Sequence, residues 1–305
     1  MEFFLQQTIN GLTLGSVYAL LALGYSMVYG VLKFLNFAHG EVYMFGAFAG
    51  YGVLTVLGGA TGLIVPVWLA VTLMFVVAII VSSAIGLALE RFAYRPLRSA
   101  SRLAPLISAI GASFFLQAAA LLLFSANSRS YDTPRLISIE TRITLGPVNV
   151  WAVRVLVIVT TVIMMILLTW WVRSSRLGKA VRAVSFDTEA AAMMGVDVDR
   201  VIVVTFLVGS ALAGVGGVMV GLVFGRIFHL MGFVAGLKAF TAAVVGGIGS
   251  IPGAMLGGLL IGFAEAYTTA YISSTFQNLI VFGLLISFLL IKPSGMLGRA
   301  ELTKV

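Results

Sequence analysis

The chain is 305 residues long, and 60% of its residues are hydrophobic while only 10% are charged. A soluble domain has about 25% charged residues, so this composition excludes an ordinary water-soluble protein. The net charge of +8 comes from basic residues in short clusters between apolar stretches. That pattern is typical of membrane topology and not of nucleic-acid binding, so we expect no nucleic-acid partner.

Cysteine is absent from the sequence, and its two histidines, His39 and His229, are far apart. These facts exclude disulfides, a thiolate nucleophile and a zinc site built on sulfur, so we expect no metal site and no cofactor in this chain. The first residues lack the basic segment of a signal peptide. We therefore expect the first apolar segment to be retained as a membrane span.

Apolar stretches of about 20 residues, the length that crosses a bilayer, recur along the chain. The clearest cover residues 8–30, 64–89, 151–172 and 201–225. Lipid cannot pair with backbone polar groups, so such segments form helices or closed barrels, and the alternation of a barrel strand is absent. The sequence predicts an all-α, polytopic helical bundle with about 8 to 10 spans, in one transmembrane domain over residues 1–305.

Polar residues interrupt the second apolar stretch at residues 36–41, where the sequence reads NFAHGE. Broken backbone at membrane depth survives only where it is buried in protein or lines an aqueous cavity. Glu41 facing lipid would cost about 2.5 to 3.5 kcal/mol. We therefore expect a break here, with His39 and Glu41 facing the interior, and His39 acting either as a structural histidine or as a substrate contact.

Clusters of basic residues predict which connections lie in the cytoplasm. They comprise Arg91, Arg95, Arg98 and Arg102 in one connection; Arg173, Arg176, Lys179, Arg182 and Arg200 in another; and Lys292, Arg299 and Lys304 in the tail. The connection at about 125–150 mixes both signs of charge, and we place it outside. An N-terminus without Lys or Arg and a basic C-terminus predict an odd number of crossings, about nine, with the N-terminus outside.

The cytoplasmic connection at about 173–200 contains a segment, residues 185–195, that favours a short helix. Asp187 or Thr188 can cap this helix, and Gly195 can end it in the left-handed conformation. Exposed Met and Ala side chains on it would invite a partner. A solvated linker with incidental helix propensity is the alternative.

Small residues at a spacing of four predict that one whole helix face packs against protein. The longest series is Gly209, Ala213, Gly217, Gly221 and Gly225. A second break is predicted at 246–253, because the sequence GGIGSIPG cannot hold a regular helix. Like the first break, it is a candidate element of a pathway.

Two charges, Lys238 and Glu265, lie deep in the apolar C-terminal third. Counting along the predicted helices puts Lys238 about 8 Å and Glu265 about 12 Å from the outer boundary. Isolated charges at such depths are costly and usually pair, so an ion pair is expected. The alternative is that Lys238 reaches the surface while Glu265 caps a broken helix.

Several motifs together resemble the permease family of branched-chain amino-acid ABC transporters. They are residues 13–20 (TLGSVYAL), 36–44 (NFAHGEVYM), 94–98 (YRPLR), 106–111 (LISAIG) and 238–244 (KAFTAAV). The likeness runs from about residue 6 to the tail at 292–299. Within the 173–200 connection, Glu189, Ala190, Ala191 and Gly195 resemble the motif by which such permeases dock onto their ATPase.

The resemblance implies a bacterial inner-membrane importer with a second, homologous permease, two ATPase subunits that use ATP and Mg, and a periplasmic or lipid-anchored binding protein. The chain itself has no Gly-x-x-x-x-Gly-Lys-Ser/Thr phosphate loop, so we expect no ATPase activity in it. The resemblance also implies that Asn36, Phe37, Phe240 and Thr241 line the path of leucine, isoleucine and valine.

Three other functions remain open from the sequence. Related transporters carry urea, amides or other neutral amino acids. An ion-coupled secondary transporter would also use broken helices and intramembrane charges. An intramembrane enzyme would have to use His39 and Glu41, but residues two apart on a helix point to different faces and no nucleophile accompanies them.

Overall fold

The computed structural model describes residues 2–58, 62–98, 100–101, 103–131, 142–145 and 148–298. Arg102, Arg299, Lys304 and most of the outer connection thus lie outside the described residues. The predicted all-α membrane bundle is confirmed: seven described helices are long and apolar enough to cross a bilayer. They are α1 (Glu2–Leu32), α3 with its extension (Val67–Leu97), α4 (Leu103–Phe124), α6 (Ala152–Ser174), α9 (Val198–Phe224), α11 (Ile251–Tyr271) and α12 with the turn before it (Ser274–Ile291).

The other elements are shorter. Two further apolar helices flank the breaks: α2 (His39–Val56) follows the first break, and α10 (Met231–Gly246) precedes the second. A π-helical turn, η2 (Leu89–Tyr94), and a 3₁₀ turn, η3 (Arg95–Leu97), extend α3, and η4 (Ser274–Phe276) leads into α12 (Gln277–Ile291). Antiparallel pairs join β1 (Arg129–Ser130) to β4 (Arg226–Ile227) and β2 (Arg142–Leu145) to β3 (Val148–Trp151).

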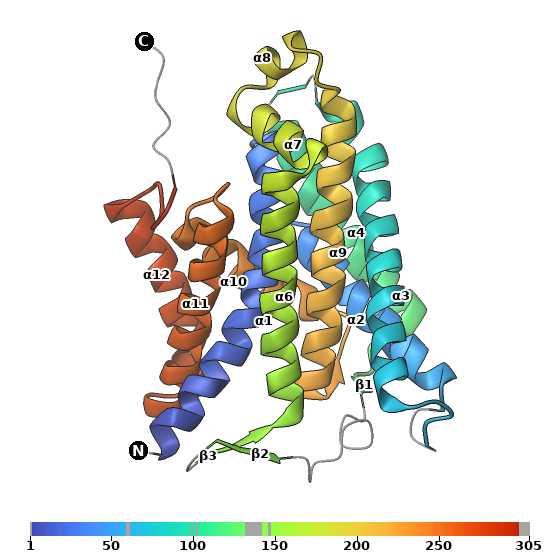
Figure 1. Cartoon of the computed structure of the whole chain (residues 1–305), viewed down its shortest axis with the longest axis vertical. Coiled ribbons are helices and arrows are strands. Elements are labelled where there is room, and N and C mark those ends of the chain that lie inside the picture. The colour runs from blue at the N-terminus through green and yellow to red at the C-terminus, as the bar shows by residue number, and fades with distance from the viewer. Residues whose placement is uncertain are drawn as a thin grey trace.

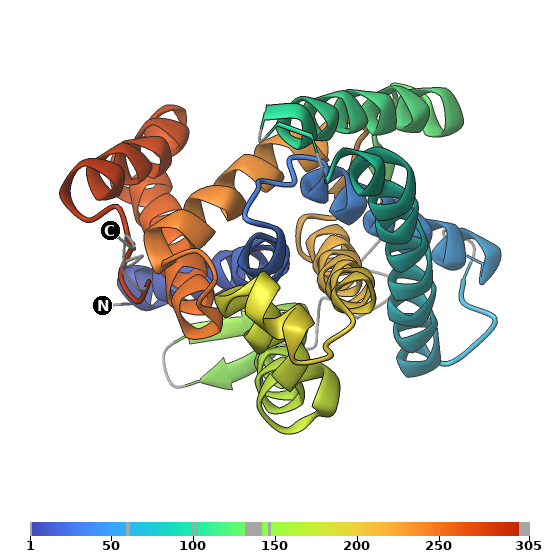
Figure 2. The same ribbon diagram turned by 90° about the horizontal axis from the view of Figure 1, so that it is seen from above.

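The bundle has a centre and two flanks (Figures 1 and 2). Helices α1 and α9 run through its middle, with α11 and α12 on one flank and α3 and α4 on the other. Two short helices, α7 (Arg176–Phe186) and α8 (Thr188–Met193), lie across one end. The strands and the start of α1 lie at the opposite end. The 173–200 and 125–150 connections are therefore at opposite ends of the molecule, as the charge pattern predicted.

The first predicted break is confirmed. Helix α1 ends at Leu32, Lys33 adopts a positive φ of 56°, and α2 begins at His39. The His39 ring lies 4.7 Å from that of Tyr25, so α2 starts beside α1 at a point about two turns before α1 ends. Glu41 is completely buried. The chain thus turns back into the bundle before α2 begins, and His39 and Glu41 face protein as predicted.

The second predicted break is also present, between Gly246 and Ile251. Gly247 and Gly249 have φ values of 108° and 86°, in the region that favours glycine. The Gly249 N–H donates to Ser26 Oγ at 2.8 Å. The last carbonyl groups of α10 have no partner within the helix, and the C-terminal segment supplies one. The N–H groups of Met296 and Leu297 donate to the carbonyls of residues 245 and 246, both at 2.9 Å.

Small residues set the spacing of the central helices. A Cβ added to Gly262 on α11 would collide with the backbone of Gly15 on α1, and one on Gly258 with that of Ala19. The series along α9 is likewise packed: Gly217 faces α2 and Gly221 faces a tyrosine ring. Because lipid provides no hydrophobic driving force between helices, such close packing is a main source of their association.

Replacing Gly262 with Ala should destabilise the bundle, because the new methyl group has no space beside α1. Overpacking of this kind costs about 1 to 3 kcal/mol. Gly283→Ala on α12 is the matched control, since a Cβ there meets nothing within 4 Å and Ala favours helix. Thermal unfolding in detergent, followed by tryptophan fluorescence, measures both. An equal Tm for the two variants would contradict this account of α1–α11 packing.

Candidate functional site

The α7–α8 end of the molecule has the predicted short helix. The Asp187 side chain caps α8 by accepting from the Ala190 N–H at 3.0 Å. Gly195 ends the turn after α8 with a φ of 83°, and the Val196 N–H closes it by donating to the Ala191 carbonyl at 3.0 Å. The cap and the stop predicted from sequence are therefore both present.

The surface around α8 is largely apolar, although α8 lies past the ends of the membrane-spanning helices. Phe186, Met193 and Met194 are each more than 80% exposed, and Glu189 is exposed beside them. Ala190 is half-buried, whereas Ala191 is buried and packs inward. We define Phe186, Glu189, Met193 and Met194 as the α8 surface. Large apolar side chains gathered at the end of a bundle indicate a binding surface for another protein.

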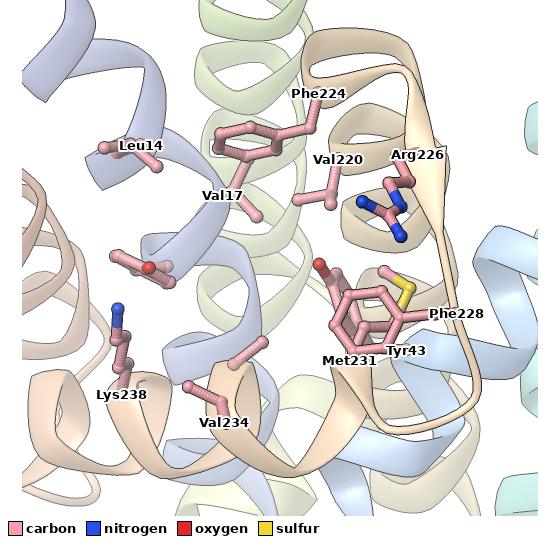
Figure 3. A pocket seen from close by; sticks show the side chains of 12 residues that line it. Leu14, Val17, Tyr43, Val220, Phe224, Arg226, Phe228, Met231, Val234 and Lys238 are labelled. Carbon is pink, nitrogen blue, oxygen red and sulfur yellow. The ribbon is translucent and has the colours of Figure 1, made fainter. Parts of the chain in front are cut away.

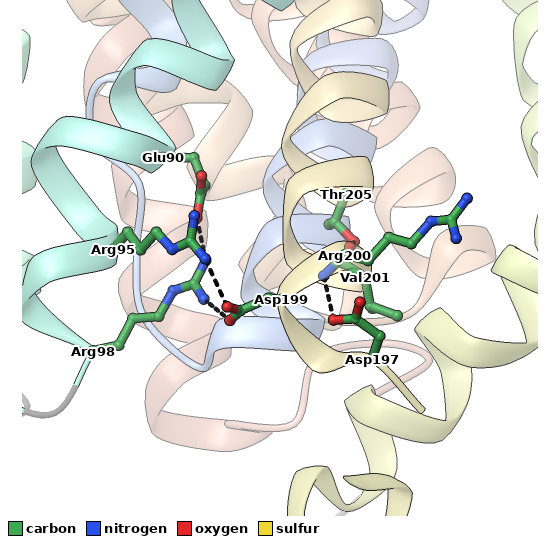
Figure 4. A network of polar contacts seen from close by, with 8 residues as sticks. All are labelled: Glu90, Arg95, Arg98, Asp197, Asp199, Arg200, Val201 and Thr205. Carbon is green, nitrogen blue, oxygen red and sulfur yellow. Dashed lines mark hydrogen bonds and ion pairs between the residues drawn. The ribbon is translucent and has the colours of Figure 1, made fainter. Parts of the chain in front are cut away.

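An ion-pair network connects the start of α9 to the end of the α3 extension (Figure 4). The Arg98 guanidinium contacts both Glu90 and Asp199, the latter at 2.6 Å, and Arg95 contacts Asp199 at 2.8 Å. Glu90 is only 2% exposed, while Asp199 is exposed. In the sequence the two arginines served only as markers of topology, and these pairs could not be predicted because Asp199 is over 100 residues away.

The residues predicted to line a pathway separate into two groups. The rings of His39 and Phe240 both contact that of Tyr25, with centroids 4.7 and 6.3 Å away, and the Phe37 ring lies 6.2 Å from that of Phe240. Asn36 and Thr241 are instead held by hydrogen bonds: Asn36 Oδ1 accepts from the Tyr94 hydroxyl at 2.6 Å, and Thr241 donates to the Leu237 carbonyl at 2.9 Å. The structure thus forms an aromatic cluster from half of the predicted set.

Glu41 points away from His39, toward α4. Its Oε1 accepts from Ser113 Oγ at 3.1 Å and from Gln117 Nε2 at 2.8 Å. Within the described part of the chain, Glu41 Oε2 and His39 Nε2 have no hydrogen-bond partner. The two side chains therefore do not act on a common atom, as their spacing on a helix implies.

Lys238 and Glu265 form a buried ion pair. The distance from Lys238 Nζ to Glu265 Oε1 is 2.6 Å, and both side chains are less than 10% exposed. The Tyr18 hydroxyl donates to the other carboxylate oxygen at 2.8 Å. Helices α1, α10 and α11 are thereby joined at one point. The ion pair expected from the sequence is present, and the alternative in which Lys238 reaches the surface is wrong.

A cavity of about 390 Å³ lies next to this ion pair (Figure 3). Its apolar walls come mainly from α1, α9 and α10, and include Leu14, Val17, Val220, Phe224, Met231 and Val234. Its polar groups belong to Tyr18, Tyr43, Arg226 and Lys238. The predicted pathway residues do not contribute to its lining. Both tyrosines belong to motifs of the sequence, at 13–20 and 36–44, whereas Arg226 belongs to none of them.

Comparison with known proteins agrees with this architecture. The family described as the branched-chain amino acid transport system permease component matches residues 7–290. The chain belongs to this family. The permease is 46% identical to the high-affinity branched-chain amino acid transport system permease protein LivH of Escherichia coli, with 99% of this chain and 98% of LivH covered. It is also 46% identical to BraD, the corresponding protein of Pseudomonas aeruginosa, over the same shares.

Replacing Lys238 with Met should destabilise the permease strongly, because Glu265 would remain buried without its cation. Breaking a buried pair by removing one partner costs about 3 to 5 kcal/mol. The double variant Lys238→Met with Glu265→Leu should recover much of that loss, since apolar replacement of both partners is often tolerated. Thermal unfolding of the singles and the double measures the coupling. A double variant that is less stable than both singles would argue against a mutually compensating pair.

Arg98 should matter more for stability than its neighbour Arg95. Arg98→Ala leaves the buried Glu90 without a cation, at a cost of about 3 kcal/mol. Arg95→Ala removes a pair between exposed side chains, worth about 1 kcal/mol or less. The two substituted sites are three residues apart in the chain, and both variants remove an arginine side chain. Equal losses in thermal unfolding would show that the burial of Glu90 is unimportant.

Proposed function

We propose that the permease is a membrane subunit of an ATP-binding-cassette importer that moves leucine, isoleucine and valine inward. The observation that carries the proposal is the 46% identity to LivH over nearly the whole of both chains. An identity of this level without large gaps in coverage supports a shared substrate class. The membrane bundle with two buried breaks is compatible with a transport pathway through protein.

Energy for transport would come from partner subunits. The chain has no phosphate-binding loop of the Gly-x-x-x-x-Gly-Lys-Ser/Thr type, and so acts as a transport subunit and not as an enzyme. Two ATPase subunits would use ATP and Mg, a second, homologous permease would complete the membrane part, and a periplasmic or lipid-anchored binding protein would deliver the substrate. The α8 surface supports this arrangement as the docking point of an ATPase subunit.

Orientation follows from charge and from the α8 surface together. The basic residues Arg173, Arg176 and Lys179 lie at the α7–α8 end, and basic connections stay in the cytoplasm. The strands at the other end would then face the periplasm, with the N-terminus outside and the C-terminus in the cytoplasm of a bacterium. The permease would be a multi-pass protein of the inner membrane.

Transport by the purified complex tests the function. The permease is reconstituted in liposomes with its partner subunits, and uptake of labelled leucine and labelled urea is measured with ATP, and separately with a proton or sodium gradient. ATP-driven uptake of leucine is expected, with no uptake of urea. Preference for urea would reassign the substrate, and uptake driven by an ion gradient alone would overturn the coupling to ATP.

Substitutions on the 187–195 segment should separate ATP hydrolysis from transport. Glu189→Ala removes the exposed charge of the α8 surface, and Gly195→Val places a branched side chain at a φ of 83°, which it tolerates poorly. Loss of a contact at an interface hot spot costs about 2 kcal/mol, or about thirtyfold in affinity. We expect normal membrane insertion with ATP-driven leucine uptake reduced by this order.

The matched control is Glu2→Ala, which removes an exposed carboxylate at the start of α1, at the end of the molecule opposite the α8 surface. It should leave uptake and ATP hydrolysis unchanged. If Glu189→Ala and Gly195→Val transport as well as this control does, the α8 surface has no coupling role.

A further inference from the structure

The cavity beside the Lys238–Glu265 pair has the size and lining of a small-molecule site. Its volume of about 390 Å³ lies within the range of about 300 to 1,000 Å³ found for such sites. Apolar side chains form most of its wall, and a few polar groups are set among them. That is the usual composition of a site in which apolar contacts bind and polar groups orient.

Two basic side chains, Lys238 and Arg226, line the cavity. Lys238 is neutralised by Glu265, which also accepts a hydrogen bond from Tyr18. Arg226 projects into the cavity from the opposite side (Figure 3). Among the described residues, no carboxylate forms an ion pair with Arg226. A guanidinium that faces a cavity favours a carboxylate ligand, which it can hold through two parallel hydrogen bonds.

The remaining polar groups suit the other end of an amino acid. The Tyr18 hydroxyl uses its proton on Glu265, so its oxygen lone pairs remain available to an ammonium group. Tyr43 also lines the cavity, and its hydroxyl oxygen can likewise accept a hydrogen bond. Between these groups lie Val17, Val220 and Val234, which offer weak apolar contacts to an aliphatic side chain.

We propose that this cavity is a transient binding site for the transported amino acid, in which Arg226 holds the carboxylate, the tyrosine hydroxyls accept from the ammonium group, and the valines contact the side chain. The proposal rests on the proposed function and specifies its substrate as an aliphatic zwitterion. Urea has neither a carboxylate nor an apolar portion, so it would gain from neither feature of the cavity.

A phospholipid with its phosphate on Arg226 is the competing occupant. The structure favours the amino acid, because the side of the cavity opposite Arg226 is lined by the ammonium group of Lys238 and by Tyr18 (Figure 3). An acyl chain gains nothing from such polar neighbours. The experiment below therefore measures whether an introduced cysteine in the cavity is protected from labelling by a zwitterion or by lipid.

Because the sequence contains no cysteine, single introduced cysteines can be used to probe the cavity by labelling. Val220→Cys and Val234→Cys place one thiol each in the cavity wall, and Ile272→Cys, 64% exposed just beyond the end of α11, is the control outside it. The complete transporter in lipid nanodiscs is labelled with the anionic reagent 2-sulfonatoethyl methanethiosulfonate. Labelling of this chain is followed in the presence of L-leucine, isopentylamine, which lacks the carboxylate, or urea.

We expect L-leucine to slow labelling at positions 220 and 234 but not at 272, and isopentylamine and urea to have little effect. Adding Arg226→Gln to the Val220→Cys background should raise the leucine concentration for half-protection about tenfold, as loss of a charge-assisted hydrogen bond does. Arg129→Gln is the matched control, since its guanidinium donates to the Phe124 carbonyl and does not line the cavity.

Two results would overturn the site while leaving the proposed function intact. The first is ATP-driven leucine uptake by the Val220→Cys and Val234→Cys complexes with no protection by leucine at either position. The second is protection that responds to the lipid composition of the nanodisc and not to leucine. Equal protection by urea would instead contradict the predicted substrate class. Failure of the unmodified complex to take up leucine would count against the proposed function itself.

Discussion

The structure depends on one constraint: groups inside a bilayer find no water, so the protein has to satisfy its own polar atoms. The break after α10 persists because Ser26 and the C-terminal segment supply its hydrogen bonds. The charge of Glu265 is tolerated because Lys238 and Tyr18 both reach it. Each local departure from a simple helix is thereby also a contact between distant segments, and the same polar groups that cost energy in lipid fix how the helices are arranged.

Close packing of the helices determines how a displacement passes through the bundle. Helix α9 begins near the α7–α8 end, where Asp199 is paired with Arg95 and Arg98, and it ends at the cavity, where Val220 and Phe224 form part of the wall. Its small residues leave little space against α2, so a displacement at one end is more readily passed along the helix than absorbed beside it. This continuity offers a physical connection between the α8 surface, the proposed docking point of an ATPase, and the proposed substrate site.

Local sequence was sufficient for features that depend on local chemistry. The positions of both breaks followed from polar or glycine-rich residues in apolar stretches, and α8 from its cap and its terminal glycine. The Lys238–Glu265 pair followed from depth alone, because helix rise converts residue number into distance. The bonds of Asn36 to Tyr94 and of Glu41 to α4 could not be predicted, since each joins segments whose relative position only tertiary packing determines.

The position of Arg226 explains why the cavity could not be predicted from the sequence. An arginine beside a glycine near the end of an apolar stretch reads as an interface residue. Its place in the cavity results instead from the β1–β4 pairing, in which Arg226 is opposite Ser130 across a two-residue antiparallel bridge. That pairing turns the chain after α9 and fixes the backbone from which the guanidinium projects, while Tyr131, the next residue beyond β1, is completely buried and donates to the Ala47 carbonyl at 2.6 Å. The charge that would recognise the substrate is thus positioned by a contact between segments far apart in the chain, and no local pattern records it.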